Sequence, residues 1–134
     1  MKIVLDTNVV VSGLFFGGYP GEILSAWHRG RITLVLSASI LAEYREVGAE
    51  LSSHYGELDF EAFAALLVMH AEVVDAPPAL AESVCSDPDD DKFLACAAAA
   101  GVAVVVSGDR HLLAVSGWRG IEILRPRAFV EQYL

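Results

Sequence analysis

The sequence contains no long hydrophobic run. A single helix needs about 20 consecutive apolar residues to span a bilayer, and no apolar stretch of this 134-residue chain approaches that length. The first residues, MKIVLDTN, reach the charged Asp6 after three apolar residues, so they lack the hydrophobic region of a signal peptide. We therefore expect a cytoplasmic protein with no membrane partner.

Cysteine and histidine are scarce. Cys85 and Cys96 are the only cysteines, and the four histidines are scattered along the chain. No Cys or His pair has the spacing of a zinc site, which argues against zinc and redox chemistry. We expect both cysteines to be buried free thiols.

Basic residues are few: nine Lys and Arg stand against eighteen Asp and Glu, for a net charge of −9. This balance argues against sequence-independent affinity for nucleic acid. The chain after Asp109 is locally basic, however, with four arginines and two glutamates. Three of these arginines, Arg110, Arg125 and Arg127, are candidates for steering RNA.

Apolar residues are abundant, at 54% of the chain, above the roughly 45–50% usual for soluble domains. A chain of this length predicts one domain, residues 1–134. The apolar surplus favours a surface for a partner or a second copy, so we expect a homodimer.

Hydrophobic patterning predicts strands that alternate with helices. The expected strands are residues 2–5, 32–37, 102–107 and 121–124, with a possible short strand at 72–75. The expected helices are residues 22–30, one or two helices within 37–55, then 58–72, 88–100, a short one after 108, and 126–134. Residues 13–18, GLFFGG, lack the phosphate-binding glycine motifs and are expected to form a flexible loop. This order predicts an α/β domain whose central parallel sheet is covered by helices on both faces.

Acidic residues follow two of the predicted strands and precede one helix. Asp6 follows the first strand, Asp109 follows the strand at 102–107, and four aspartates crowd positions 87–91 before a helix. One or two acids there would stabilise the helix start, and Asp87 suits the cap. Additional neighbouring carboxylates repel one another unless a cation offsets them. Because ligands bind beyond the carboxyl ends of parallel strands, we expect these acids to meet at one sheet edge.

Clustered carboxylates without soft ligands are typical of a site for magnesium or manganese, as one ion or two. Such ions acidify a bound water and stabilise the leaving oxygen in phosphodiester hydrolysis. Glu43, in the helix after the second strand, is a further candidate; as a lone glutamate on an amphipathic helix it also fits a solvated surface acid.

Four motifs follow one another along the chain in this order: IVLDTNVVVSGLF, the glutamate at position 43, DPDDDKFLACAAAAG and VVVSGDRHLL. Together they resemble a PIN domain, and especially the PIN-type toxins of bacterial toxin–antitoxin pairs. The resemblance covers residues 3–113. It implies a magnesium- or manganese-dependent ribonuclease that leaves 5′-phosphate and 3′-hydroxyl ends, with an antitoxin protein as partner.

The resemblance assigns the four acids of that ribonuclease site to Asp6, Glu43, Asp90 and Asp109. Asp90 is preferred as the third acid because it stands three residues before a hydrophobic position of the following helix. Asp91 competes for that role and otherwise makes a secondary contact to metal or water.

Two further residues support this site by resemblance. Ser107 stands where these proteins commonly have Thr and keeps the hydroxyl. Asn8 either holds Asp6 or a metal-bound water, or closes the strand with an Asx-turn. His111 stands where a further Asp is common, which removes a possible fifth carboxylate.

Other functions fit less well. A receiver domain would require a lysine after the last strand, yet the last lysine is Lys92. A dehalogenase-type phosphatase would require a second Asp where Asn8 stands. The alternative that remains is a catalytically weak or inactive PIN-like module that binds RNA or a protein partner.

Overall fold

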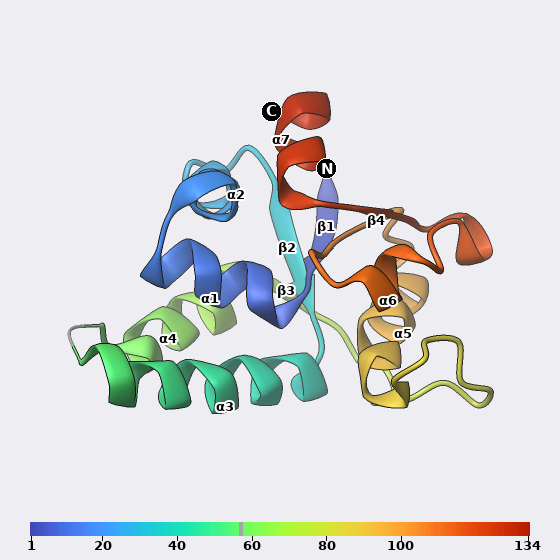
Figure 1. Cartoon of the computed structure of the whole chain (residues 1–134), viewed down its shortest axis with the longest axis horizontal. Helices are drawn as coiled ribbons and strands as arrows, with labels where there is room; N and C mark the ends of the chain where they lie inside the picture. Colours follow the sequence, from blue (N-terminus) through green and yellow to red (C-terminus); the bar gives the residue numbers. More distant parts are fainter. Residues whose placement is uncertain (57) are drawn as a thin grey trace.

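The computed structural model describes residues 1–56 and 58–134. Its centre is a five-stranded sheet in the order β3-β2-β1-β4-β5, and every neighbouring pair is parallel. The strands are β1 (Lys2–Leu5), β2 (Thr33–Leu36), β3 (Glu72–Val73), β4 (Val104–Val106) and β5 (Glu122–Leu124). The prediction of a parallel α/β domain is confirmed, and Figure 1 shows β1 and β2 in the middle of the molecule.

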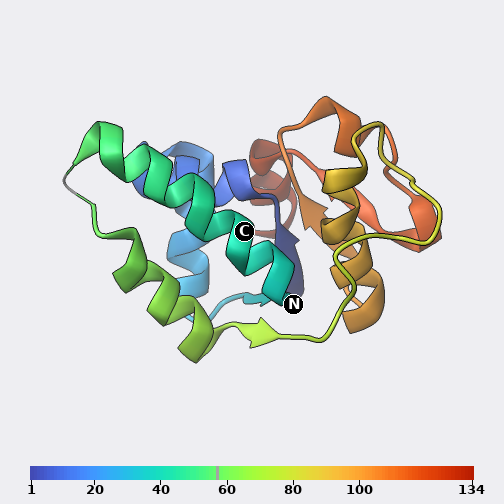
Figure 2. The same cartoon turned by 90° about the horizontal axis from the view of Figure 1, so that it is seen from below.

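Among the described residues, seven α-helices flank the sheet. They are α1 (Thr7–Phe15), α2 (Gly18–His28), α3 (Ala38–Tyr55), α4 (Phe60–His70), α5 (Asp91–Ala100), α6 (Arg110–Leu113) and α7 (Pro126–Tyr133), with 3₁₀ turns η1 (Pro88–Asp90) and η2 (Trp118–Gly120). Helix α5 packs on β1, β2 and β4, and α1 packs on α2 and α3. Figure 2 shows α1 and α2 on one side of β1 and α5 on the other.

Strand β1, the centre of the sheet, and its neighbour β4 are buried on both faces. Ile3, Val4 and Leu5 of β1 are at most 1% exposed, and the three valines of β4 at most 3%. Continuous β-branched runs are typical of such doubly covered parallel strands, because neither face meets water. These strands therefore hold the residues that follow their carboxyl ends in fixed positions.

The region after β1 departs from the prediction. Residues 13–18 were expected to form a flexible loop, but α1 runs to Phe15 and α2 already begins at Gly18. Three consecutive valines disfavour a helix by propensity, yet Val9, Val10 and Val11 are all buried, and this tertiary burial outweighs propensity. Gly17 and Gly18 have positive φ, a conformation open to glycine, at the break where the chain turns by 93° between α1 and α2.

Other helix ends are capped by side chains or end at glycine. The Ser37 hydroxyl accepts from the Ile40 N–H at the start of α3, and the Asp59 carboxylate accepts from the Ala62 N–H at the start of α4. Gly101 ends α5 in the left-handed conformation.

The described residues include no single helix that is both long and apolar enough to cross a membrane. Helices α1 and α2 pass that test of length and composition only when taken together, across their bend.

Candidate active site

The topology has one switch point. From β1 the chain adds β2 and then β3 on one side, and afterwards places β4 and β5 on the other side of β1. The crevice beyond the carboxyl ends of β1 and β4 is therefore the expected ligand site of such a sheet. Asp6 directly follows β1, and its backbone N–H donates to the Val106 carbonyl at 2.9 Å. Asp109 follows β4 by three residues, so both acids stand at this crevice.

Ser107 joins the two strand ends. Its hydroxyl donates to Asp6 Oδ2 at 2.6 Å and accepts from the Asp109 N–H at 3.0 Å. The serine is fully buried, so this bridge is shielded from competing water. Asp109 Oδ1 in turn accepts from the His111 N–H at 2.8 Å and caps α6. A hydroxyl at position 107 therefore fixes the side chain of one acid and the backbone of the other.

Asp90 completes a group of mutually repelling acids. Burial, followed by the negative charges of Asp6 and Asp109, raises its pKa to about 7. The pKa of Asp6 is also raised, first by burial, with smaller contributions from the charges of Glu43 and Asp109. Carboxylates raise one another's pKa in this way when they share a region that lacks enough positive charge. Asp6, Asp90 and Asp109 are therefore near enough to one another to interact electrostatically.

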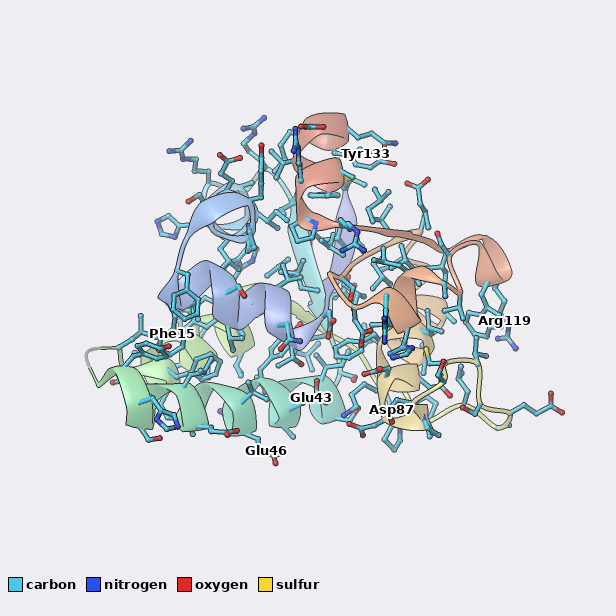
Figure 3. The ribbon with its side chains drawn as sticks, viewed as in Figure 1. Phe15, Glu43, Glu46, Asp87, Arg119 and Tyr133 are labelled. Atoms are coloured by element: carbon cyan, nitrogen blue, oxygen red, sulfur yellow. The ribbon has the colours of Figure 1, made fainter. Side chains whose placement is uncertain are left out.

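Glu43 lies on α3 beside this group but has partners of its own. Its Oε1 is 2.9 Å from Lys92 Nζ, and its Oε2 accepts a hydrogen bond from the Thr7 hydroxyl. The neighbouring Tyr44 donates its hydroxyl to the Leu5 carbonyl, which ties α3 to the end of β1. Figure 3 shows Glu43 on α3 and Asp87 ahead of α5 in the same lower part of the molecule.

Lys92 was not predicted as a site residue. It is the only lysine besides Lys2, and it follows the aspartate cluster directly. That position was a usable signal, because a single lysine after four aspartates is well placed to pair with a neighbouring acid.

Asp91 is hydrogen-bonded to the loop that precedes α5. It is 1% exposed, and its oxygens accept the N–H of Cys85 at 2.8 Å and of Val84 at 3.1 Å. Burial alone would raise the pKa of Asp91, but the hydrogen bonds, led by the Cys85 N–H, lower it overall. This geometry favours a structural role, in which Asp91 holds the loop before α5, over the predicted contact to metal. The charges of Asp6 and Asp109 contribute, after burial, to the raised pKa of Asp90, so Asp90 is the acid of this stretch that lies near them.

Two smaller expectations can be compared with the structure. Asn8 is an exposed residue within the first turn of α1, so it does not close the strand with an Asx-turn. Asp87 accepts the Asp89 N–H at 3.0 Å and caps the 3₁₀ turn that leads into α5.

The three candidate arginines differ in position. Arg110 begins α6 directly after Asp109, and Arg125 Nη1 donates to the Gly108 carbonyl at 3.4 Å. Both therefore lie at the rim of the crevice. Arg127 is exposed and pairs with Glu131 on α7 at 2.9 Å. Arg110 and Arg125 are the better placed to meet a phosphate.

The donor chemistry of the crevice fits a hard cation. Its carboxylates supply oxygen ligands only. Burial first, and the negative charges of neighbouring acids second, raise the pKa of Asp6 and Asp90. No group of three or more His, Cys, Asp or Glu side chains within residues 1–56 and 58–134 is already gathered to hold a metal ion. The site is therefore suitable in charge and ligand type, and the ligands would have to converge on binding.

The raised pKa of Asp90 predicts that the stability of the metal-free protein depends on pH. Below about pH 4 Asp90 is protonated in both folded and unfolded chains. Between about pH 4 and 7 the unfolded chain loses this proton while the folded chain keeps it, so stability falls as pH rises. We expect Asp90→Asn to be more stable than wild type at about pH 8 and equal to it near pH 4. Urea denaturation with a chelator measures this difference, and a difference independent of pH would contradict it.

Comparison with known proteins identifies the family of this chain. A family model described as PIN domain matches residues 2–111, which is most of the chain. A comparison with curated proteins gave no match. PIN domains are typically nucleases that use divalent metals. On its sequence, its parallel sheet and the acids at the switch point, this chain belongs to the PIN domain family.

Proposed function

We propose that this protein is a magnesium- or manganese-dependent endoribonuclease and the toxin of a toxin–antitoxin pair. The observation that carries the nuclease proposal is the position of Asp6 and Asp109 after β1 and β4, where Ser107 joins them. Asp90 lies near enough for their negative charges to add to the effect of burial in raising its pKa. Acids used only for structure would be expected to have partners that lower their pKa, as Asp91 does.

Each residue has a defined part in this proposal. Asp6, Asp90 and Asp109 would hold the divalent ion, which supplies a polarised phosphate and an acidified water when bound. Ser107 holds the Asp6 side chain and the Asp109 backbone in place through its two hydrogen bonds. The guanidinium groups at the rim of the crevice attract the phosphodiester backbone into a site that is otherwise negative.

Labelled single-stranded RNA tests the proposal directly. Purified protein is incubated with the RNA and Mn²⁺, Mg²⁺ or a chelator, and the product ends are mapped. We expect cleavage only with a divalent ion, leaving 5′-phosphate and 3′-hydroxyl ends. Binding of RNA without cleavage in either metal would support the alternative, a PIN-like module that has lost catalysis.

The arginines at the rim predict a measurable salt dependence. Each cation that neutralises one phosphate of a single strand contributes about 0.7 to the slope of log affinity against log salt. Arg125→Gln should therefore flatten the slope by roughly that amount, and the exposed, Glu131-paired Arg127 should contribute less. Fluorescence anisotropy with a chelator present measures binding without cleavage. An unchanged slope for Arg125→Gln would remove it from the RNA-binding surface.

The toxin role includes an antitoxin and a homodimer. Several large apolar side chains are exposed on or beside α4 and β3, among them Leu66, Val68, Met69 and Val73, between 45% and 72%. Such a surface supports the proposal of a protein partner, because water contact with apolar side chains is unfavourable. Light scattering measures the mass in solution, and a monomer at all concentrations would contradict the homodimer.

A further inference from the structure

Lys92 brings a buried positive charge to the acidic crevice. It is the second residue of α5, and its Nζ lies 2.9 Å from Glu43 Oε1 and 3.2 Å from Asp89 Oδ1. The side chains of Lys92 and Glu43 are 9% and 19% exposed, whereas that of Asp89 is 69% exposed. Water screens the exposed contact strongly and the shielded one weakly. The pair with Glu43 is therefore the dominant interaction of this lysine.

Both carboxylate oxygens of Glu43 already have partners within the protein. One oxygen meets the Lys92 ammonium, and the other accepts the Thr7 hydroxyl. Within residues 1–56 and 58–134, none of the three aspartates of the crevice forms an ion pair with a cationic side chain. Glu43 thus differs from Asp6, Asp90 and Asp109 in having its charge already compensated.

We propose that Lys92 is the permanent counter-ion of Glu43 and a positioning residue of the site. It keeps Glu43 bound to the protein, so that one divalent cation is held by the three aspartates without direct coordination by Glu43. This inference rests on the proposed function, since it concerns how the same crevice takes its metal.

The electrostatic reason is that a second metal ion and the Lys92 ammonium would compete for the carboxylate of Glu43. A second divalent ion coordinated by Glu43 would stand within a few ångströms of the Lys92 ammonium, and like charges at that separation repel strongly in a shielded site. Lys92 supplies a positive charge where a second metal would otherwise neutralise Glu43. One ion per chain is the expected consequence.

A charge-conserving double variant tests this. Glu43→Gln combined with Lys92→Met removes the pair without changing the net charge and leaves no buried charge unpaired. Mn²⁺ alone is titrated at about pH 8, where carboxylates are ionised, and is followed by calorimetry and by the electron paramagnetic resonance of free Mn²⁺. We expect one ion per wild-type chain and a double variant whose dissociation constant stays within about fivefold of wild type.

For the single variant Lys92→Met we expect tighter binding of Mn²⁺ than in wild type. Removing the ammonium frees Glu43, so Mn²⁺ should bind at least about tenfold more tightly. Removal of a lysine with a purely structural role would not strengthen metal binding. If Lys92→Met fails to fold, as judged by circular dichroism, the double variant still decides the question.

The outcomes separate this inference from the proposed function. Two ions per wild-type chain, a larger loss in the double variant, or unchanged affinity in folded Lys92→Met would overturn the inference alone, provided that wild-type binding is lost in Asp6→Asn. Failure of wild type and both Lys92 variants to bind Mn²⁺ would overturn the inference and the proposed metal site together.

Discussion

Replacement of Asp6 by Asn is expected to reduce metal-dependent RNA cleavage by at least about 100-fold, because it removes a charged oxygen from a site whose metal affinity rests on clustered carboxylates. Asp6 stands at the switch point, is 5% exposed, and is directed by its bond from Ser107. Initial rates of cleavage of labelled RNA in Mn²⁺ measure the effect. Wild-type rates in the variant would contradict the proposed site.

This variant should not lose activity by unfolding. An Asn side-chain oxygen can still accept from Ser107, and the backbone contact to Val106 is unchanged. Burial raises the pKa of Asp6, which means that its charge costs stability in the metal-free protein. We expect the melting temperature without metal to be equal to that of wild type or higher. Asp75→Asn is the matched control: it makes the same chemical change at an exposed position, and its cleavage rate should be unchanged.

Replacement of Asp91 by Asn is expected to destabilise the protein by roughly 2–4 kcal/mol. The carboxylate accepts two backbone N–H groups of the loop before α5 and is almost fully buried. An amide can accept at its oxygen only, so its NH₂ group would face a buried N–H donor and leave it unsatisfied. Urea denaturation measures the loss, with Asp75→Asn again as the control.

The same variant decides the role of Asp91. If Asp91 holds the loop, the folded fraction of Asp91→Asn should bind Mn²⁺ with nearly wild-type affinity under conditions that keep it native. If stability is unchanged and Mn²⁺ affinity falls more than about tenfold, Asp91 is a metal contact and the structural assignment is wrong.

Much of the fold could be predicted from the sequence. Runs such as those that form β1 and β4 are apolar and β-branched because both their faces are covered, and this identifies buried parallel strands. Helix caps such as Ser37 and Asp59 bind N–H groups only three residues away, so this part of the fold depends on the local sequence. Helix α1 could not, because its three valines favour a strand by propensity and become helical only through burial against the rest of the protein.

The site was predicted in outline and missed in detail for a similar reason. Asp6 and Asp109 could be placed at one edge because each follows a strand of a parallel sheet. Neighbours in sequence were harder to separate: Asp90 lies near these two acids, Asp91 turns to Cys85, and Lys92 reaches Glu43, which lies 49 positions away. Successive residues at a helix start point in different directions, about 100° apart, and only the packed surroundings decide what each one meets.

The sequence by itself therefore determined the fold class, the family and the group of acids from which a metal site could be made, since these depend on periodicity and on which residue follows which strand. Tertiary structure alone decided which acid is a structural anchor, which is paired with a lysine, and which remain unneutralised. Those distinctions depend on burial and on contacts between segments far apart in the chain.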